Sequence, residues 1–77
     1  MKELIQQFEE KLKRHLENTF SASPGTDNIK RLSETEKTVY DFVDNYILES
    51  DFIAADLEPS VQYILDEFAK SKINYIE

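Results

Sequence analysis

The segment SETEKTVYDFVDNYIL, residues Ser33 to Leu48, decides the fold class of this chain. Its apolar residues recur at intervals of three and four, the spacing of one buried helical face: Val39, Phe42, Val43, Tyr46 and Ile47. Ser33 and Glu36 form a capping-box pattern, which predicts that the helix begins there. Leu48 lies on the polar side and is expected to be an exposed apolar residue. We predict a central helix over residues 33–49.

A second helical pattern covers residues 2–20. Its apolar residues recur every four positions: Leu4, Phe8, Leu12, Leu16 and Phe20. Because a helical turn takes 3.6 residues, this stripe drifts by about 40° per step and winds around the helix. Such a stripe can contact two neighbouring helices or a second copy of the chain, so a homodimer through this helix is one expectation. The single histidine, His15, lies beside the stripe and is expected to pack its ring at the core edge.

The segment between these helices breaks the apolar pattern, and we predict a surface loop over residues 21–32. Pro24 and Gly25 fit the two central positions of a type II turn. Ile29 and Leu32 are the only apolar residues near this loop, and we expect them to anchor it.

A third long helix is predicted over residues 57–72, preceded by a short turn at 52–56 and followed by a tail at 73–77. We expect Phe52 and Ile53 to reach the core, Tyr63 to be exposed, and Pro59 to lie in the first turn of the helix, where proline is tolerated. The buried stripe comprises Leu57, Val61, Ile64, Leu65 and Phe68. The predicted fold is a single all-α domain over residues 1–77. It is a small three-helix bundle, or a four-helix bundle if the turn counts, with a C-terminal half like a helix-turn-helix.

The net charge of −7 is concentrated in the second half of the chain. No Lys or Arg occurs between Lys37 and Lys70, an interval that contains eight acids: Asp41, Asp44, Glu49, Asp51, Asp56, Glu58, Asp66 and Glu67. Such a surface argues against a general affinity for nucleic acid or anionic membranes. The chain has no apolar run of the ~20 residues that a membrane span requires, and its first residues lack the apolar region of a signal peptide. We expect a soluble cytoplasmic protein.

No group of residues in the sequence points to catalysis, a metal or a cofactor. The chain has no cysteine, and Asp41 and Asp44 lack the spacing and the central glycine of an EF-hand. His15 has no second histidine or nucleophile beside it. The chain is also too short to form the cleft that a catalytic carboxylate pair requires. We therefore expect a protein that is not an enzyme.

Two partial resemblances suggest alternatives. Leu32, Ser33, Glu36 and Lys37 form a Leu-Ser-x-x-Glu-Lys phrase that resembles the start of the N-terminal domain of RpiR-type repressors, which implies a helix-turn-helix transcriptional regulator. Residues 55–77, ADLEPSVQYILDEFAKSKINYIE, are similar to the acidic N-terminal region of primary bacterial sigma factors, a helical domain that can occupy the DNA channel of RNA polymerase. This likeness agrees with a DNA-mimicking inhibitor of a nucleic-acid-binding protein such as RNA polymerase. Both resemblances imply a bacterial or phage protein.

The acidity favours a third reading, a small regulatory or adaptor protein that binds another protein with a basic surface. Spaced carboxylates would steer such a partner and select it, while exposed Leu48 and Tyr63 would supply apolar contacts. The predicted partner-binding residues are Asp41, Asp44, Leu48, Glu49, Asp51, Tyr63, Asp66 and Glu67.

Overall fold

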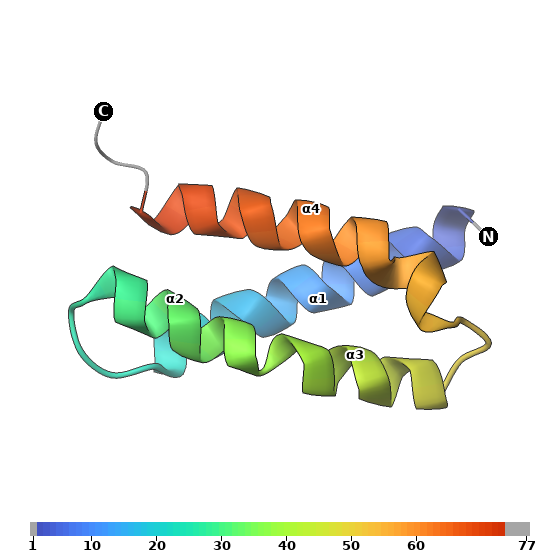
Figure 1. Ribbon diagram of the computed structural model, residues 1–77, viewed down its shortest axis with the longest axis horizontal. Coiled ribbons are helices and arrows are strands. Elements are labelled where there is room, and N and C mark those ends of the chain that lie inside the picture. The colour runs from blue at the N-terminus through green and yellow to red at the C-terminus, as the bar shows by residue number, and fades with distance from the viewer. Residues whose placement is uncertain (1, 74–77) are drawn as a thin grey trace.

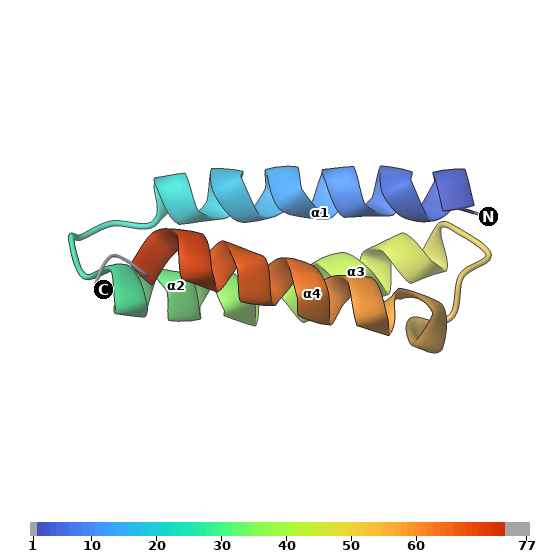
Figure 2. The same cartoon turned by 90° about the horizontal axis from the view of Figure 1, so that it is seen from above.

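The computed structural model describes residues 2–73, which form four helices joined by short connections. They are α1 (Lys2–Ala22), α2 (Asn28–Lys37), α3 (Val39–Leu48) and α4 (Ala54–Ile73). In Figures 1 and 2, α2 and α3 follow each other along one side, antiparallel to α1 and α4. The bundle therefore has three rods, and the described residues contain no strand. The prediction of a small all-α bundle is confirmed, while the predicted tail lies outside the described residues from position 74 on.

α2 begins at Asn28, five residues before the predicted helix start. The Asp27 carboxylate accepts hydrogen bonds from the backbone amides of Ile29 and Lys30, at 3.1 and 3.3 Å, and so caps the helix. The loop predicted over residues 21–32 is shorter in the structure, where only residues 23–27 connect the helices. The cap predicted at Ser33 is wrong, since Ser33 lies inside α2. The preceding Gly25 has a φ of 99°, which agrees with the position that favours glycine in a type II turn.

The helix predicted over residues 33–49 is interrupted at Thr38. Both the amide and the hydroxyl of Thr38 donate to the carbonyl of Thr35, at 3.0 and 2.7 Å. A backbone hydrogen bond to the carbonyl three residues earlier, instead of four, winds the chain more tightly at this residue, as in a 3₁₀ turn. The α-helical pattern then resumes, because the Phe42 amide donates to the Thr38 carbonyl at 3.1 Å. One predicted helix is thus two consecutive helices.

α4 begins at Ala54 and includes most of the turn predicted at 52–56. The Asp56 carboxylate accepts a hydrogen bond from the Ile53 amide at 3.1 Å, as the acidic residue of a capping box does. Phe52 and Leu57 are both buried and occupy the two positions at which a hydrophobic staple forms across a helix start. The earlier start places Pro59 at the sixth residue of α4, beyond the first turn in which it was predicted.

The core contains twelve buried apolar residues contributed by all four helices and by Phe52: Phe8, Leu12, Leu16, Phe20, Leu32, Val39, Val43, Phe52, Leu57, Val61, Ile64 and Phe68. The predicted stripes of α1 and α4 supply most of them. Ile29 and Ile53 differ from expectation, because both are more than half exposed. Each lies within two residues of a helix start. Leu32, one turn after Ile29, and Phe52, just before Ile53, are the residues that are buried.

The winding stripe of α1 contacts two different helices of its own chain. Near its start, the Phe8 ring lies 5.0 Å from the Tyr46 ring of α3. At its end, the Phe20 ring lies 5.7 Å from the Phe68 ring of α4. Of the stripe residues only Leu4 is exposed, by 50%. A homodimer through α1 stays a prediction, and within the monomer this stripe is already packed.

The C-terminal end of α1 is held by Arg31 of α2. The Arg31 guanidinium donates to the backbone carbonyls of Phe20 and Ser23, at 2.9 and 3.1 Å, and lies 4.3 Å from the centroid of the Phe20 ring. The last turn of α1 has no basic residue of its own. Arg31 therefore satisfies carbonyls at the end of α1 that no helical amide can reach.

The helix cap at Asp27 gives a direct test of where α2 begins. Asp27→Ala should lower the free energy of unfolding by about 0.5–2 kcal/mol, because two amides lose their acceptor. Ser33→Ala should change it by less than about 0.5 kcal/mol, since Ser33 is exposed inside the helix. Urea unfolding followed by circular dichroism measures both values. A larger loss for Ser33→Ala would contradict this helix start.

Two leucines test the core assignment. Leu16 is fully buried and Leu48 is 82% exposed. Leu16→Ala should cost about 2–5 kcal/mol through lost burial and the cavity left behind. The matched Leu48→Ala should cost less than about 0.5 kcal/mol in the same urea experiment. Equal costs would show that the core is assigned incorrectly.

Candidate functional site

The eight residues predicted to bind a partner are all exposed, yet the structure divides them among several surfaces. Asp41, Asp44 and Leu48 share the outward face of α3, because they are spaced by three and four residues. The exposure predicted for Leu48 and Tyr63 is confirmed. Their role in binding stays a prediction.

Glu49 and Asp51 lie on the side of α3 that faces α1. Glu49 lines a hollow of about 310 Å³ with Lys11, Phe42 and Tyr46. Asp51 lines a neighbouring hollow of about 330 Å³ with Leu4, Tyr46 and Phe52. Tyr46 and Ser50 line both hollows, so the two hollows adjoin each other, and together we call them the groove between α1 and α3.

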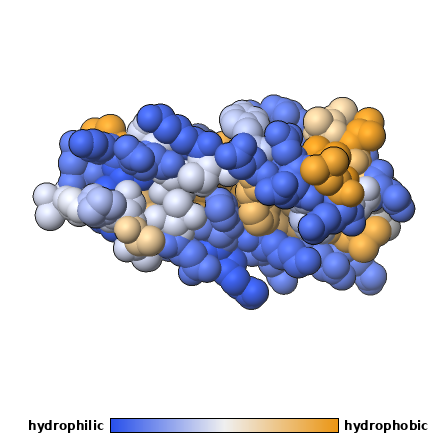
Figure 3. Space-filling model, turned by 90° about the horizontal axis from the view of Figure 1, so that it is seen from below, coloured by the Kyte–Doolittle hydropathy of each residue, from blue (hydrophilic) through white to orange (hydrophobic). Residues whose placement is uncertain are grey.

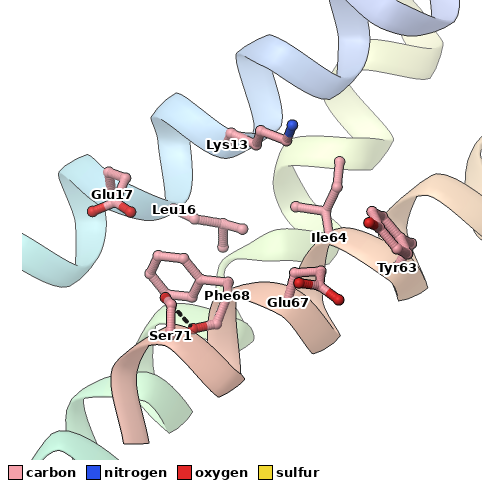
Figure 4. A pocket seen from close by; sticks show the side chains of 8 residues that line it. All are labelled: Lys13, Leu16, Glu17, Tyr63, Ile64, Glu67, Phe68 and Ser71. Atoms are coloured by element: carbon pink, nitrogen blue, oxygen red, sulfur yellow. Dashed lines mark hydrogen bonds between the residues drawn. The ribbon is translucent and has the colours of Figure 1, made fainter. Parts of the chain in front are cut away.

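The three predicted residues of α4 are divided between two other sides. Tyr63 and Glu67 line a hollow of about 310 Å³ between α1 and α4, shown in Figure 4. Leu16 belongs to its apolar floor, and Lys13 brings a positive charge to its rim, so this hollow has mixed charge. Asp66 instead lines a hollow between α4 and the α2–α3 rod. The structure therefore does not bring the α3 and α4 residues into one site.

Most of these acids take part in no ion pair among the described residues. Within residues 2–73 the ion pairs are Lys70 with Asp66, at 3.1 Å, and Lys72 with Glu17, at 3.2 Å. The hydrogen bond and the charge of Asp66 raise the pKa of Lys70 above its ordinary value. The predicted acids on and just after α3 take part in neither pair. Lys11 of α1 lines the same hollow as Glu49, whereas Asp41 and Asp44 direct their negative charge to solvent.

Four aromatic rings form a stacked row along the groove between α1 and α3. We call His15, Phe42, Tyr46 and Phe52 the aromatic ladder. Successive centroids are 4.6, 6.5 and 6.3 Å apart, and successive planes differ by only 22–23°. Sequence reasoning placed Phe42 and Tyr46 in the core and missed the ladder. Their spacing of four residues was the available signal, while the contributions of His15 and Phe52 depend on tertiary packing.

His15 links this ladder to the break between α2 and α3. Its Nε2 lies 2.9 Å from the Thr38 hydroxyl oxygen. The Thr38 hydroxyl donates its proton to the Thr35 carbonyl, so we assign Nε2 of His15 as the donor to Thr38. Burial lowers the pKa of His15 below its ordinary value of 6.5. The predicted packing of this ring at the core edge is confirmed by its half-buried position and its stacking on Phe42.

Hydrophobic surface gathers at one end of the bundle. Figure 3 shows it where α3 ends and α4 begins, and Figure 1 shows the start of α1 at the same end. The large exposed apolar residues of these segments are Leu4, Leu48 and Ile53. The groove between α1 and α3 therefore opens beside an apolar surface.

Other kinds of site find little support in the part of the chain that the structure describes. It contains no group of three His, Cys, Asp or Glu residues arranged to hold a metal ion. Over the same residues, every buried side-chain nitrogen and oxygen has a hydrogen-bond partner. The described helices include none that combines the length and the apolar character of a membrane span.

Comparison of the chain with protein-family models, curated proteins and solved structures found no match. The resemblances to RpiR-type repressors and to sigma factors therefore stay expectations from the sequence.

The lowered pKa of His15 predicts how stability depends on pH. The unfolded chain binds a proton near pH 6.5, whereas the folded chain binds it only at lower pH. This contribution to stability is therefore complete above pH 6.5 and is lost as the pH falls toward the folded pKa. His15→Gln, which keeps a donor for Thr38, should lessen the fall in stability between about pH 7 and 5. Urea unfolding across this range checks the slope.

The folded pKa itself can be read by NMR titration of the imidazole ring. A midpoint above 6.5 in the folded protein would contradict the assigned direction.

Proposed function

We propose that this protein is a small acidic regulatory or adaptor protein that binds another protein through a basic surface of that partner. The observation that carries the proposal is the surface around α3. Asp41, Asp44, Glu49 and Asp51 take part in neither ion pair found among the described residues. Asp41 and Asp44 share the outward face of α3 with Leu48, a leucine that is 82% exposed, while Glu49 and Asp51 follow at the end of the helix on the side toward α1. We call these five residues the acidic surface.

The physical role of the acidic surface is to attract and then select a partner. Charges that no local base neutralises act over about one Debye length, ~8 Å at physiological salt, and raise the rate of encounter with a basic surface. Asp41 and Asp44 are three residues apart, so they lie about one helical turn apart and can each meet a separate Lys or Arg. An exposed leucine among them adds an apolar contact that a surface kept only for solubility does not need.

The helix-turn-helix regulator and the DNA-mimicking inhibitor stay alternatives. A helix-turn-helix protein should retain a DNA probe in a gel-shift series at low salt. An inhibitor that mimics DNA should compete with the DNA of its partner for one site, whereas an adaptor need not.

A charge-reversal pair tests the proposal. We expect Asp41→Lys/Asp44→Lys/Glu49→Lys to lower recovery of the partner at least tenfold when tagged protein is incubated with lysate from its own source. The control, Glu3→Lys/Glu10→Lys/Glu34→Lys, changes the net charge equally at exposed positions outside the acidic surface and should keep binding. All six substituted residues are exposed in the fold, so circular dichroism should show the wild-type helix content for both variants. Equal recovery with both variants would refute the electrostatic proposal.

A further inference from the structure

The groove between α1 and α3 offers a more specific binding site than the acidic surface alone. We call Leu4, Lys11, Phe42, Tyr46, Glu49 and Phe52 the docking groove; Ser50 and Asp51 also line it. Its floor is aromatic, and two of the three rings, those of Phe42 and Tyr46, are only half-buried. Leu4 at one end is 50% exposed. The groove therefore presents apolar surface that the monomer does not cover.

The spacing of the rings suits an α-helix. The centroid of Tyr46 lies 6.5 Å from that of Phe42 and 6.3 Å from that of Phe52. Side chains one turn apart on a helix have Cβ atoms about 5–6 Å apart. A helix lying along α3 can therefore place successive apolar side chains against successive rings, which is the helix-in-groove mode of recognition.

The charges beside the groove favour a basic occupant. Glu49 and Asp51 lie along its α3 side, and both take no part in the ion pairs of the described residues. The face of Tyr46 accepts a cation, since Nζ of Lys11 lies 5.6 Å from its centroid. A lysine or arginine of a partner can therefore pair with the carboxylates or take the place of Lys11.

A second copy of this chain fits the groove less well. The surface around the groove is acidic on both copies, so a symmetric contact brings like charges together. The large exposed apolar residues at this end are only Leu4, Leu48 and Ile53. Their surface is small compared with the roughly 800 Å² that each partner buries in a standard stable interface.

We propose that the docking groove binds the apolar face of a basic amphipathic helix, while Glu49 and Asp51 pair with its lysines or arginines. This inference rests on the proposed function and assigns the kind of partner segment and where it lies.

The probe is a synthetic helical peptide of leucine and lysine, with the leucines spaced by three and four residues. The control peptide has glutamate in place of lysine. Added to ¹⁵N-labelled protein, the lysine peptide should shift the backbone amides of Leu4, Tyr46, Ser50 and Phe52, and the glutamate peptide should not. Glu49→Lys/Asp51→Lys should weaken binding at least tenfold. The matched control, Glu34→Lys/Glu58→Lys at exposed positions of α2 and α4 outside the groove, should weaken it less than twofold.

Several results would overturn the groove. In the titration, the proposal fails if the lysine peptide does not bind, if the glutamate peptide binds equally well, or if the shifts are confined to the outward face of α3 or to α4. In the comparison of variants, it fails if the two charge reversals weaken binding equally. Shifts of the groove amides that grow with protein concentration without peptide would identify a second copy as the occupant and also overturn the proposal. The proposed function has its own test in the charge-reversal pull-down. If that experiment succeeds while the peptide shifts lie elsewhere, only the groove is wrong.

Discussion

The bundle depends on the mismatch between a stripe that repeats every four residues and a helix that turns every 3.6. Over the four steps of the stripe from Leu4 to Phe20, this mismatch rotates the apolar face of α1 by about 160°. The stripe therefore reaches α3 near its start, where Phe8 meets Tyr46, and α4 and α2 at its end, where Phe20 meets Phe68 and Arg31. A single straight helix thus fills the core between two others, in a chain that has no disulfide to supplement it.

Polar side chains then fix where each helix begins and ends. Asp27 caps the start of α2, Asp56 caps the start of α4, and Arg31 holds the last carbonyls of α1. Arg31 lies over one aromatic ring of the core, and Lys72 of α4 lies 5.0 Å from the centroid of the same Phe20 ring. These cations occupy the end of the bundle opposite the docking groove. The two ends therefore differ in kind, one closed by cation–aromatic contacts and the other open and apolar.

The sequence predicted the parts of the fold that depend on periodicity. Leu12 and Val61 are buried because each lies within a long helical stripe, and the exposure of Leu48 followed from the same spacing. Helix ends were harder, because Ser33 with Glu36 has the full capping-box pattern and Asp27 does not, yet it is Asp27 that caps α2. The break at Thr38 was not predictable, because the imidazole that contacts its hydroxyl is 23 residues away. The division of the acids among separate surfaces likewise depends on how α4 packs against the other helices. The spacing of residues along one helix carries no information about that packing.

The break at Thr38 has a consequence for cooperativity. Proteins open in contiguous units whose limits follow their hydrogen-bond networks. At this break the Thr35 carbonyl is held by the amide and hydroxyl of Thr38, and His15 of α1 donates to that hydroxyl. Unwinding that begins at Leu48 therefore meets a boundary before it reaches α2. α3, which forms one wall of the groove, can then open on its own while α2 keeps its contacts with α1 and α4.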